Sequence, residues 1–345
     1  MQIPKPDQIE VIAPNLKRRL SGVTATIVRL VPIQARDIGI VATGPGLPPS
    51  VPHVPLWRLP LLPRRRQVWH ARRNTEMLLG LFLKTVFRMP LRLLFTSASQ
   101  RKHTGYTKWL ISKMDMVVAT SSRTASYLER PCRAILHGID TGAFSPPDDR
   151  AALRTSLGVP NGVLVGCYGR IRAQKGTDAF VDAMISILPD RPGVTALVMG
   201  RATESHGAFL EGLRAKVHDA GLAGRIRFLP EVTVDRMADW YRVLDLYVAP
   251  QRWEGFGLTP VEAMACGVPV VATRVGAFEE IVTPQTGALV APDDIPALAT
   301  ATAAFLDDPA RLSAASEAAR LRVEESFRIE AEAAALIAIY REMLA

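Results

Sequence analysis

The sequence predicts an α/β protein made of two doubly wound domains that face each other across a cleft, each built on a parallel sheet. Short apolar runs alternate with longer helical stretches along all 345 residues. The runs are apolar throughout instead of at every second residue, which is typical of strands buried on both faces. A turn-rich segment at residues 140–161 interrupts the alternation and marks the expected seam between the domains.

In the first half, each expected strand is a short apolar run bounded by turn residues. The expected strands are residues 9–13, 38–43, 68–71, 91–96, 116–120 and 134–136. The expected helices are residues 23–36, 75–87, 106–113 and 123–129. Residues 44–66 are rich in Pro and Arg, and this composition predicts a loop around one short strand.

The second half repeats the alternation. Its expected strands are residues 163–168, 195–199, 226–229, 244–249, 268–272 and 288–290. Its expected helices are residues 176–188, 208–220, 235–242, 260–265 and 295–306, followed by Ala-rich helices at 309–325 and 329–344. We therefore expect an N-terminal domain over 1–145, a C-terminal domain over 146–325, and a final helix over 326–345 that packs back on the N-terminal domain.

Charge is divided unevenly along the chain. Residues 1–150 hold 23 Lys and Arg against 9 Asp and Glu, a net charge of +14, whereas residues 151–345 hold 19 against 24, a net charge of −5. Runs of basic residues stand at 17–19, 64–66, 72–73 and 101–102. This asymmetry indicates an anionic partner for the first half: a nucleic acid, a phosphorylated substrate or an acidic membrane surface. A merely solvated basic surface is the alternative.

Several classes of protein are disfavoured. No run of about 18 apolar residues is present that could span a membrane. The first residues lack the basic-then-apolar pattern of a signal peptide. Cys132, Cys167 and Cys266 are too few for a disulfide framework and are expected to be buried thiols in a reducing compartment. We therefore expect a cytoplasmic protein.

Familiar nucleotide and metal motifs are absent from the sequence. The P-loop pattern G-x-x-x-x-G-K-[ST] does not occur, and Gly44-Pro45-Gly46 leads into Leu-Pro-Pro instead of the helix that a dinucleotide fingerprint requires. There is no D-x-D triplet to hold a metal–diphosphate complex and no His or Cys spacing typical of zinc. Neither a bound metal nor a cofactor is expected.

The segment 169–176 follows the first strand of the second half and leads into a helix. Gly169 and Gly176 let backbone amides approach an anion, and Arg170 and Lys175 add full positive charges beside a helix N-terminus. The pattern favours a phosphate site, although an ordinary strand-to-helix turn with exposed basic residues has the same composition.

A second segment, residues 254–262, follows the strand at 244–249 and also ends in a helix. Glu254 is expected on the loop, where a carboxylate can accept hydrogen bonds from sugar hydroxyls, and Gly255 and Gly257 free the backbone to approach a ligand. Glu262 has an alternative structural explanation, because Thr259 as N-cap with Glu262 three residues later is a capping-box pattern.

These segments resemble the family 4 retaining glycosyltransferases. Glu254 and Glu262, with seven residues between them, are similar to that family's E-x7-E signature. Residues 263–273 and the segments Gly169-Arg170-Ile171-x3-Lys175-Gly176 and His137-Gly138-Ile139-Asp140 also match the family. In the first half, residues 13–24, 69–77 and 95–103 resemble the lipopolysaccharide-core mannosyltransferases within it.

The resemblance implies a GT-B fold and a role for each of these residues. Arg170 and Lys175 would hold the donor diphosphate and stabilise the leaving nucleotide. Glu254 would bind hydroxyls of the donor sugar and Glu262 the ribose. The resemblance also implies that Gly169, Gly255 and the backbone amides of Phe256, Gly257 and Leu258 contact the phosphates and the sugar. With the charge carried by Arg, Lys and amides, no metal is required.

The first half departs from the family pattern in two places. Ser21-Gly22 stands where the family has Gly-Gly, so a diphosphate contact is implied for the Gly22 amide alone. The family often has a His after the strand at 91–96, where this sequence has Ser97-Ala98-Ser99. His70 and His103 are the remaining candidates near strand ends for contact with substrate, and His70 is our candidate catalytic residue. Retaining transfer of this type lets the leaving phosphate take the acceptor proton, so no nucleophile is assigned.

The implied reaction also accounts for the basic first half. An acceptor of lipid A carrying acidic Kdo sugars presents phosphates and carboxylates at the inner face of the membrane, which the +14 half would attract. We therefore expect a hexosyltransferase, moving mannose from GDP-mannose, that is peripheral to the cytoplasmic membrane. A UDP-sugar donor, a nucleotide-sugar 2-epimerase on the same fold and a nucleic-acid-binding protein are the alternatives. Dispersed basic residues and low aromatic content disfavour nucleic acid as the partner.

Overall fold

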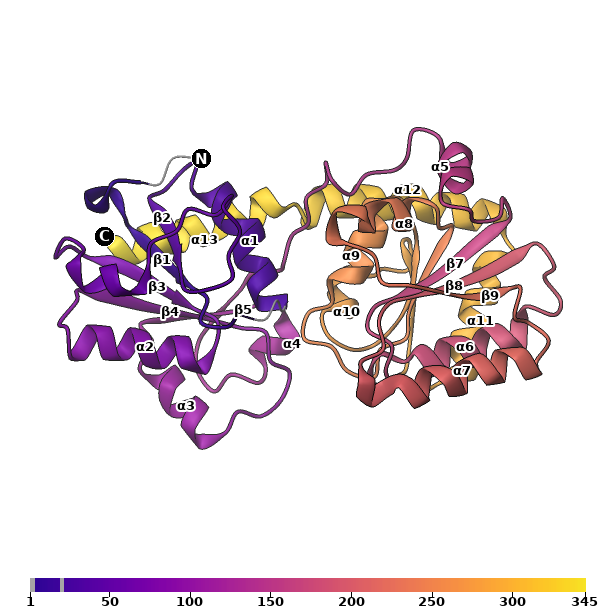
Figure 1. Cartoon of the computed structure of the whole chain (residues 1–345), viewed down its shortest axis with the longest axis horizontal. Helices are drawn as coiled ribbons and strands as arrows, with labels where there is room; N and C mark the ends of the chain where they lie inside the picture. The colour runs from indigo at the N-terminus through magenta and orange to yellow at the C-terminus, as the bar shows by residue number, and fades with distance from the viewer. Residues whose placement is uncertain (1–3, 19–21) are drawn as a thin grey trace. The chain divides into compact units, whose positions relative to one another are not determined.

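The computed structural model describes residues 4–18 and 22–345. Three residues of the predicted motif at 13–24, Arg19, Leu20 and Ser21, lie outside the described part. The chain forms two compact units: Met1–His137 with Ile329–Ala345, and Gly138–Arg328 (Figure 1). Each unit is an α/β structure around one parallel sheet.

The sheet of the first unit has six parallel strands in the order β2-β1-β3-β4-β5-β6. The strands are β1 (Val11–Pro14), β2 (Ile40–Thr43), β3 (Gln67–Ala71), β4 (Leu91–Ser97), β5 (Met116–Ala119) and β6 (Arg133–Ala134). Between β2 and β3, where we expected one short strand, the chain has a single bridge from Ala42 to His53 and the 3₁₀ helix η2 (Leu56–Leu61). The prolines of this segment disfavour strand pairing because they lack the backbone N–H.

Helices cover both faces of this sheet. The helices are η1 (Pro6–Gln8), α1 (Gly22–Gln34), α2 (Asn74–Thr85), α3 (Gly105–Ser112), α4 (Ser122–Ala125) and α13 (Ile329–Leu344). Alternate strand residues face two separate cores: Ile12 and Trp69 point to the side of α2 and α3, and Val11 and Val68 to the side of α1 and α13. The two helix layers are visible in Figure 1.

The sheet of the second unit also has six parallel strands, in the order β12-β11-β10-β7-β8-β9. The strands are β7 (Val163–Tyr168), β8 (Val194–Met199), β9 (Ile226–Leu229), β10 (Leu246–Ala249), β11 (Val270–Thr273) and β12 (Gly287–Val290). The strands after β7 continue first on one side of it and then, from β10, on the other. This change of side makes the carboxyl ends of β7 and β10 the switch point, where ligands bind in open α/β sheets.

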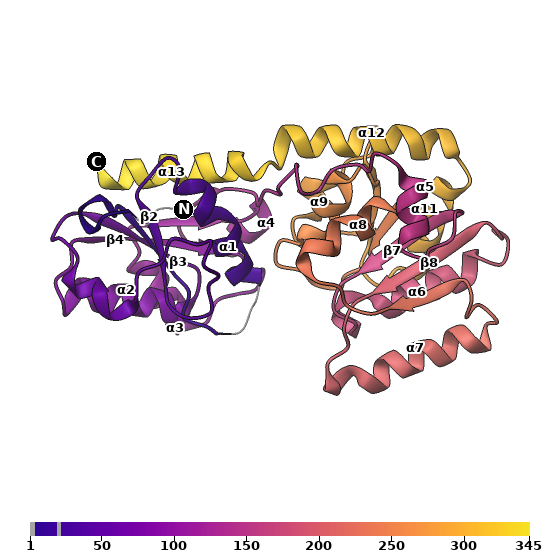
Figure 2. The same ribbon diagram turned by 45° about the horizontal axis from the view of Figure 1, so that its top comes forward.

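Helices again lie on both faces. The α-helices are α5 (Arg150–Ser156), α6 (Thr177–Ile187), α7 (Gly207–Asp219), α8 (Met237–Arg242), α9 (Leu258–Ala265), α10 (Phe278–Ile281), α11 (Ile295–Leu306) and α12 (Pro309–Ser326). The 3₁₀ helices are η3 (Ala173–Lys175), η4 (Glu204–His206) and η5 (Val234–Arg236). One core joins α6, α7 and α11 to the sheet, and Figure 2 shows α6 and α7 on the same side of it.

The second unit begins earlier than the sequence indicated, at Gly138 instead of residue 146. The intervening segment belongs to this unit because Arg242 donates to the carbonyls of Ala143 and Ser145, and Arg320 donates to those of Thr141 and Phe144. The expected seam also contains a helix that we did not predict, α5. Its Arg154 is buried against the residues that lead into β10, where it donates to the carbonyl of Val243 and forms an ion pair with Asp245.

The last helix, α13, groups with the first unit. Arg133 on β6 forms two hydrogen bonds with Glu342, and His137 pairs with Glu332 at 2.7 Å. Tyr340 is fully buried between the helix and the sheet. Among the described residues, no helix is long and apolar enough to cross a membrane.

Candidate active site

The segments after β7 and β10 lie side by side at the switch point of the second unit. The two strands pair directly, with Val165 opposite Leu246 and Gly166 opposite Tyr247. Gly176, the N-cap of α6, lets the segment after β7 approach the segment after β10 closely. Its φ is +69°, and a Cβ there would lie 1.9 Å from the carbonyl oxygen of Pro250. A residue with a side chain would therefore push the two segments apart.

Lys175 and Glu254 form an ion pair across these two segments. Both side chains are about four-fifths buried, with exposed fractions of 21% and 18%. The second carboxylate oxygen of Glu254 accepts a hydrogen bond from the Gly255 N–H at 3.0 Å. The sequence placed a cation and a carboxylate near a ligand, and the structure brings them into direct contact.

The loop that carries Glu254 is fixed by tight packing around Gly257. This glycine has a φ of +89°, and a Cβ there would lie 2.2 Å from Phe278 Cε1 and 2.9 Å from Glu254 Cγ. Gly257 is also the N-cap of α9, so the helix begins at Leu258 and its first N–H groups have no partner within the helix. The capping box expected for Thr259 and Glu262 is therefore wrong, because the left-handed glycine starts the helix two residues earlier than that motif requires.

Replacing Gly257 with alanine is expected to destabilise the protein by about 1–3 kcal/mol, since the new methyl group meets Phe278 in a strained backbone conformation. Gly207→Ala is the matched control: Gly207 begins α7 with a φ of −58°, and a Cβ there meets no atom within 4 Å. Urea unfolding of both variants checks the prediction. Equal stabilities for the two would contradict it.

Glu262 lies on α9 and is held by a buried tyrosine. The Tyr241 hydroxyl donates to its carboxylate at 3.0 Å. Burial, and then the neighbouring Glu262, raise the pKa of Tyr241 well above 10, so the hydroxyl keeps its proton and remains a donor. The carboxylate is half-buried, with its orientation set from behind. Its predicted contact with a ribose stays a prediction.

Gly169 and Arg170 lie at the exposed end of β7. The Gly169 N–H donates to the carbonyl of Met199 at 2.9 Å, and the buried Ile171 donates to that of Arg201 at 3.1 Å, which fixes the backbone on both sides of Arg170. Within residues 4–18 and 22–345, no hydrogen bond or ion pair engages the Arg170 guanidinium. One small pocket at this edge is lined by Gly169, Arg170 and Lys175. The exposed Arg170 guanidinium, which has no partner among the described residues, therefore lies beside the Lys175–Glu254 pair.

Arg252 joins the two segments, and sequence reasoning missed it. Its guanidinium donates to both carboxylate oxygens of Asp178 in the first turn of α6, at 2.7 and 2.9 Å, and also to the carbonyl of Ala173. The bond to Asp178 is the main cause that raises the pKa of Arg252 above its usual range. Asp178 is 74 positions away in the chain, so no local pattern predicts the contact.

The candidate residues of the first unit lie near the carboxyl end of its own sheet. Gly22 is exposed and begins α1. The loop before it is anchored by Asn15, which is fully buried and which we had not singled out as a site residue. The Asn15 amide donates to the carbonyls of Lys17 and Pro45, and its oxygen accepts from Thr24 and Arg73 at 3.0 Å each.

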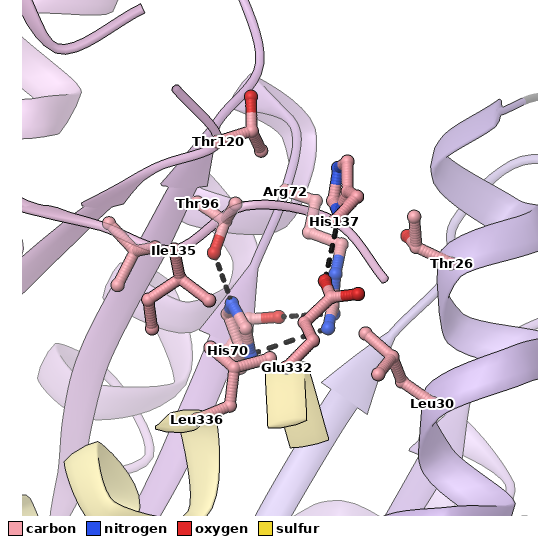
Figure 3. Close-up of a pocket in the computed structure, with 11 residues that line it drawn as sticks. Thr26, Leu30, His70, Arg72, Thr96, Thr120, Ile135, His137, Glu332 and Leu336 are labelled. Carbon is pink, nitrogen blue, oxygen red and sulfur yellow. Dashed lines mark hydrogen bonds and ion pairs between the residues drawn. The ribbon is translucent and has the colours of Figure 1, made fainter. Parts of the chain in front are cut away.

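His70 is completely buried at the end of β3. Its two ring nitrogens are hydrogen-bonded to Tyr340 and Thr96, each at 2.7 Å, as Figure 3 shows for the Thr96 side. Burial, and then the positive charge of Arg72, hold the pKa of His70 well below 6.5. The imidazole is therefore neutral and committed to partners within this unit, and its contact with substrate stays a prediction.

The stability of the protein should depend on pH through His70. Below pH 6.5 the unfolded chain takes up a proton at this residue while the folded protein does not, so folding stability falls as the pH drops. Between pH 7.5 and 5.5 the wild type should lose about 1.4 kcal/mol more than His70→Gln. Urea unfolding at both pH values measures this. The exposed His218→Gln is the control, and the same pH dependence in all three proteins would refute the prediction.

His103 is the second histidine of the first unit near a strand end. It lines a pocket with Lys108 on α3 and with Tyr127 and Glu129 after α4. Burial and nearby cations lower its pKa below 6.5. Within the described residues, no group of three or more His, Cys, Asp or Glu is placed to hold a metal ion.

Comparison with known proteins identifies the family. Residues 162–308 match the family described as "Glycosyl transferases group 1". The chain is 55% identical to "Lipopolysaccharide core biosynthesis mannosyltransferase LpsB" of Rhizobium meliloti, covering 97% of this chain and 98% of that protein. It is 52% identical to the "Lipopolysaccharide core biosynthesis mannosyltransferase LpcC" of Rhizobium leguminosarum, covering 97% of each. The chain belongs to the group 1 glycosyltransferases.

The fold agrees with this assignment. Anabaena Alr3699/HepE in complex with UDP superposes with a TM-score of 0.84 at 18% identity, covering 97% of this chain and all of that one. The predictions of a GT-B glycosyltransferase with two parallel α/β sheets, and of a likeness to lipopolysaccharide-core mannosyltransferases, are confirmed. The matched region contains Arg170, Lys175 and Glu254 at the switch point of the second unit, and Glu262 on α9.

Proposed function

We propose that this glycosyltransferase moves mannose from GDP-mannose onto the Kdo-lipid A region of a lipopolysaccharide core, with retention at the sugar carbon and without a metal ion. The observation that carries the proposal is the 55% identity with the mannosyltransferase LpsB over nearly the full length of both proteins. Because the alignment covers both units, the similarity includes the N-terminal half, which would bind the acceptor, as well as the C-terminal half, which would bind the donor.

The site chemistry supports a nucleoside diphosphate leaving group. Arg170 has no partner among the described residues, and Lys175 stands beside it. Two cations and the first N–H groups of α9 supply the positive charge that a departing diphosphate requires, which is the contribution a metal ion makes in other transferases. In this proposal the diphosphate takes the acceptor proton as it leaves, so no side chain serves as the base.

The two carboxylates take the sugar-binding roles. Glu254 is held by the Gly255 amide and Lys175, and its oxygens can accept hydrogen bonds from hydroxyls of the mannose. Glu262, oriented by Tyr241, would accept bonds from the ribose hydroxyls. Holding both ends of the donor fixes the sugar carbon relative to the acceptor, and such positioning accounts for a large part of the rate of group transfer.

The proposal places the protein on the cytoplasmic face of the membrane as a peripheral protein. The acceptor carries phosphates and carboxylates at that surface, and the first 150 residues have a net charge of +14. A bilayer rich in anionic lipid attracts basic residues near its surface by about 1 kcal/mol each.

A thermal-shift panel with GDP, UDP, ADP and their common sugar conjugates tests the donor assignment. A ligand at about 100 times its dissociation constant adds roughly 2.7 kcal/mol of stability, which is readily seen. We expect selective stabilisation by GDP and GDP-mannose. A preference for UDP would remove mannose from the proposal but keep the glycosyltransferase. Conversion of GDP-mannose without an acceptor would instead indicate a 2-epimerase.

A further inference from the structure

Exposed large hydrophobic side chains are concentrated on the first unit. Of the twelve found among the described residues, nine belong to this unit and three to the second. Those of the first unit lie on η2, α2 and α3 or directly after α2: Leu56, Trp57, Leu61, Leu78, Phe82, Val86, Phe87, Tyr106 and Trp109. Gathered apolar side chains of this size mark an interaction surface, whereas single ones do not.

Helix α2 is apolar on both of its faces. Its inner face buries Met77, Gly80 and Leu83 against the sheet. Its outer face carries Leu78, Phe82 and the C-cap residue Val86, spaced four apart and exposed by 44%, 47% and 62%. A surface helix normally presents charged residues on that side. The outer face of α2 therefore indicates contact with an apolar partner.

The segment of η2 adjoins the C-terminal end of α2. Leu59 and Leu62 share a core cluster with Leu83, and Arg64 donates to the carbonyl of Phe87. On the exposed side of η2, Trp57 and Leu61 are 66% and 74% exposed. We name the exposed apolar side chains of this region, Leu56, Trp57, Leu61, Phe82, Val86 and Phe87, the η2–α2 face.

The charge around the η2–α2 face has one sign. Residues 56–66 and 78–92 contain basic residues and no Asp or Glu: Arg58, Arg64, Arg65, Arg66, Lys84, Arg88 and Arg92. Lys84 and Arg92 pair with Asp115. The other five form no ion pair with any described residue. Arg58 lies over the ring of Trp57, with its guanidinium carbon 4.9 Å from the centroid.

We propose that the η2–α2 face is where this protein docks on an anionic lipid bilayer. Trp57, Phe82 and Phe87 would enter the headgroup region, where amphipathic and aromatic rings are favoured. The arginines beside them that form no ion pair would meet lipid phosphates. Apolar contacts combined with one-signed charge fit a bilayer of anionic lipid better than a second copy of this chain, whose net charge is also positive at +9. The inference rests on the peripheral location proposed above and assigns it a surface.

Vesicle co-sedimentation tests this with the full chain, using phosphatidylglycerol–phosphatidylethanolamine vesicles and phosphatidylcholine vesicles. The apolar variant is Trp57→Ser with Val86→Ser, and the charge variant is Arg58→Gln with Arg66→Gln. The controls remove two exposed apolar side chains or two exposed cations from the second unit: Val234→Ser with Leu321→Ser, and Lys216→Gln with Arg236→Gln.

The wild type and both controls should bind the anionic vesicles, and binding should weaken with salt and on phosphatidylcholine. Each η2–α2 variant should lose about 10-fold or more in partitioning. Equal binding by variants and controls, or no binding by the wild type, would overturn the proposal. Self-association of the wild type that the apolar variant abolishes would overturn it too, and would make the face a protein interface.

A parallel measurement separates this proposal from the proposed function. The η2–α2 variants should keep their thermal response to GDP and their transfer to a detergent-dispersed acceptor, because the altered residues lie outside the donor site. Loss of vesicle binding with these activities intact supports the docking surface. A protein that binds vesicles through this face but does not respond to GDP would contradict the donor assignment and leave the surface in place.

Discussion

Replacing Lys175 with alanine should lower the turnover number for sugar transfer by about 10²–10³-fold, the usual effect of removing one group that stabilises developing charge. The affinity for GDP should fall as well, since the proposed function has the ammonium group bind the diphosphate before and after transfer. The pairing of Lys175 with Glu254 makes a second consequence specific to this structure: the variant leaves a largely buried carboxylate without its counter-charge.

Steady-state kinetics and GDP titration of the folded variant measure both effects. Lys216→Ala is the control, because Lys216 also forms an ion pair in the second unit, with Asp182, but on the surface of α7 and α6. It should retain wild-type kinetics. Unchanged turnover in Lys175→Ala would remove this residue from the reaction.

Replacing Glu254 with glutamine should lower turnover by about 10²-fold while GDP continues to bind at least as tightly as in the wild type. The amide keeps the shape of the side chain but loses the charge that accepts strong hydrogen bonds from sugar hydroxyls. It also releases Lys175 from its ion pair, which leaves the cation available to the diphosphate. The two substitutions are thus expected to act in opposite directions on GDP affinity.

The double variant Lys175→Ala with Glu254→Gln supplies the check. Residues in direct contact are not independent, so the loss in the double variant should be smaller than the product of the two single losses. If Glu254→Gln weakens GDP and GDP-mannose binding to the same degree, the carboxylate acts on the nucleotide part instead of the sugar, and the assigned role is wrong.

The sheets could be predicted from the sequence because buried parallel strands leave a strong pattern. The apolar runs at 163–168 and 226–229 coincide with β7 and β9, and helices α11 and α13 begin and end where their periodicity indicated. The family motifs placed Arg170, Lys175, Glu254 and Glu262 at the ends of β7 and β10. Neighbouring strand ends then bring these residues together without further information.

Features that depend on distant contacts could not be predicted. Helix α5 lies in a segment rich in Pro and Asp, a composition typical of a linker. Its position depends on the contacts of Arg154 with Val243 and Asp245. The start of α9 depends on Gly257 fitting against Phe278, so the local capping pattern gave the wrong first residue. Arg252 and Asn15 organise the site through partners that no nearby sequence reveals.

Transfer to a defined acceptor tests the central claim most directly. Purified protein is incubated with GDP-mannose and Kdo-lipid A, released GDP is quantified, and the product linkage is determined by NMR. The proposed function predicts one GDP released for each mannose attached, with the same configuration at the sugar carbon as in the donor, and transfer that continues in the presence of a metal chelator. An inverted linkage, a requirement for added metal, or transfer from a UDP-sugar instead of GDP-mannose would contradict it.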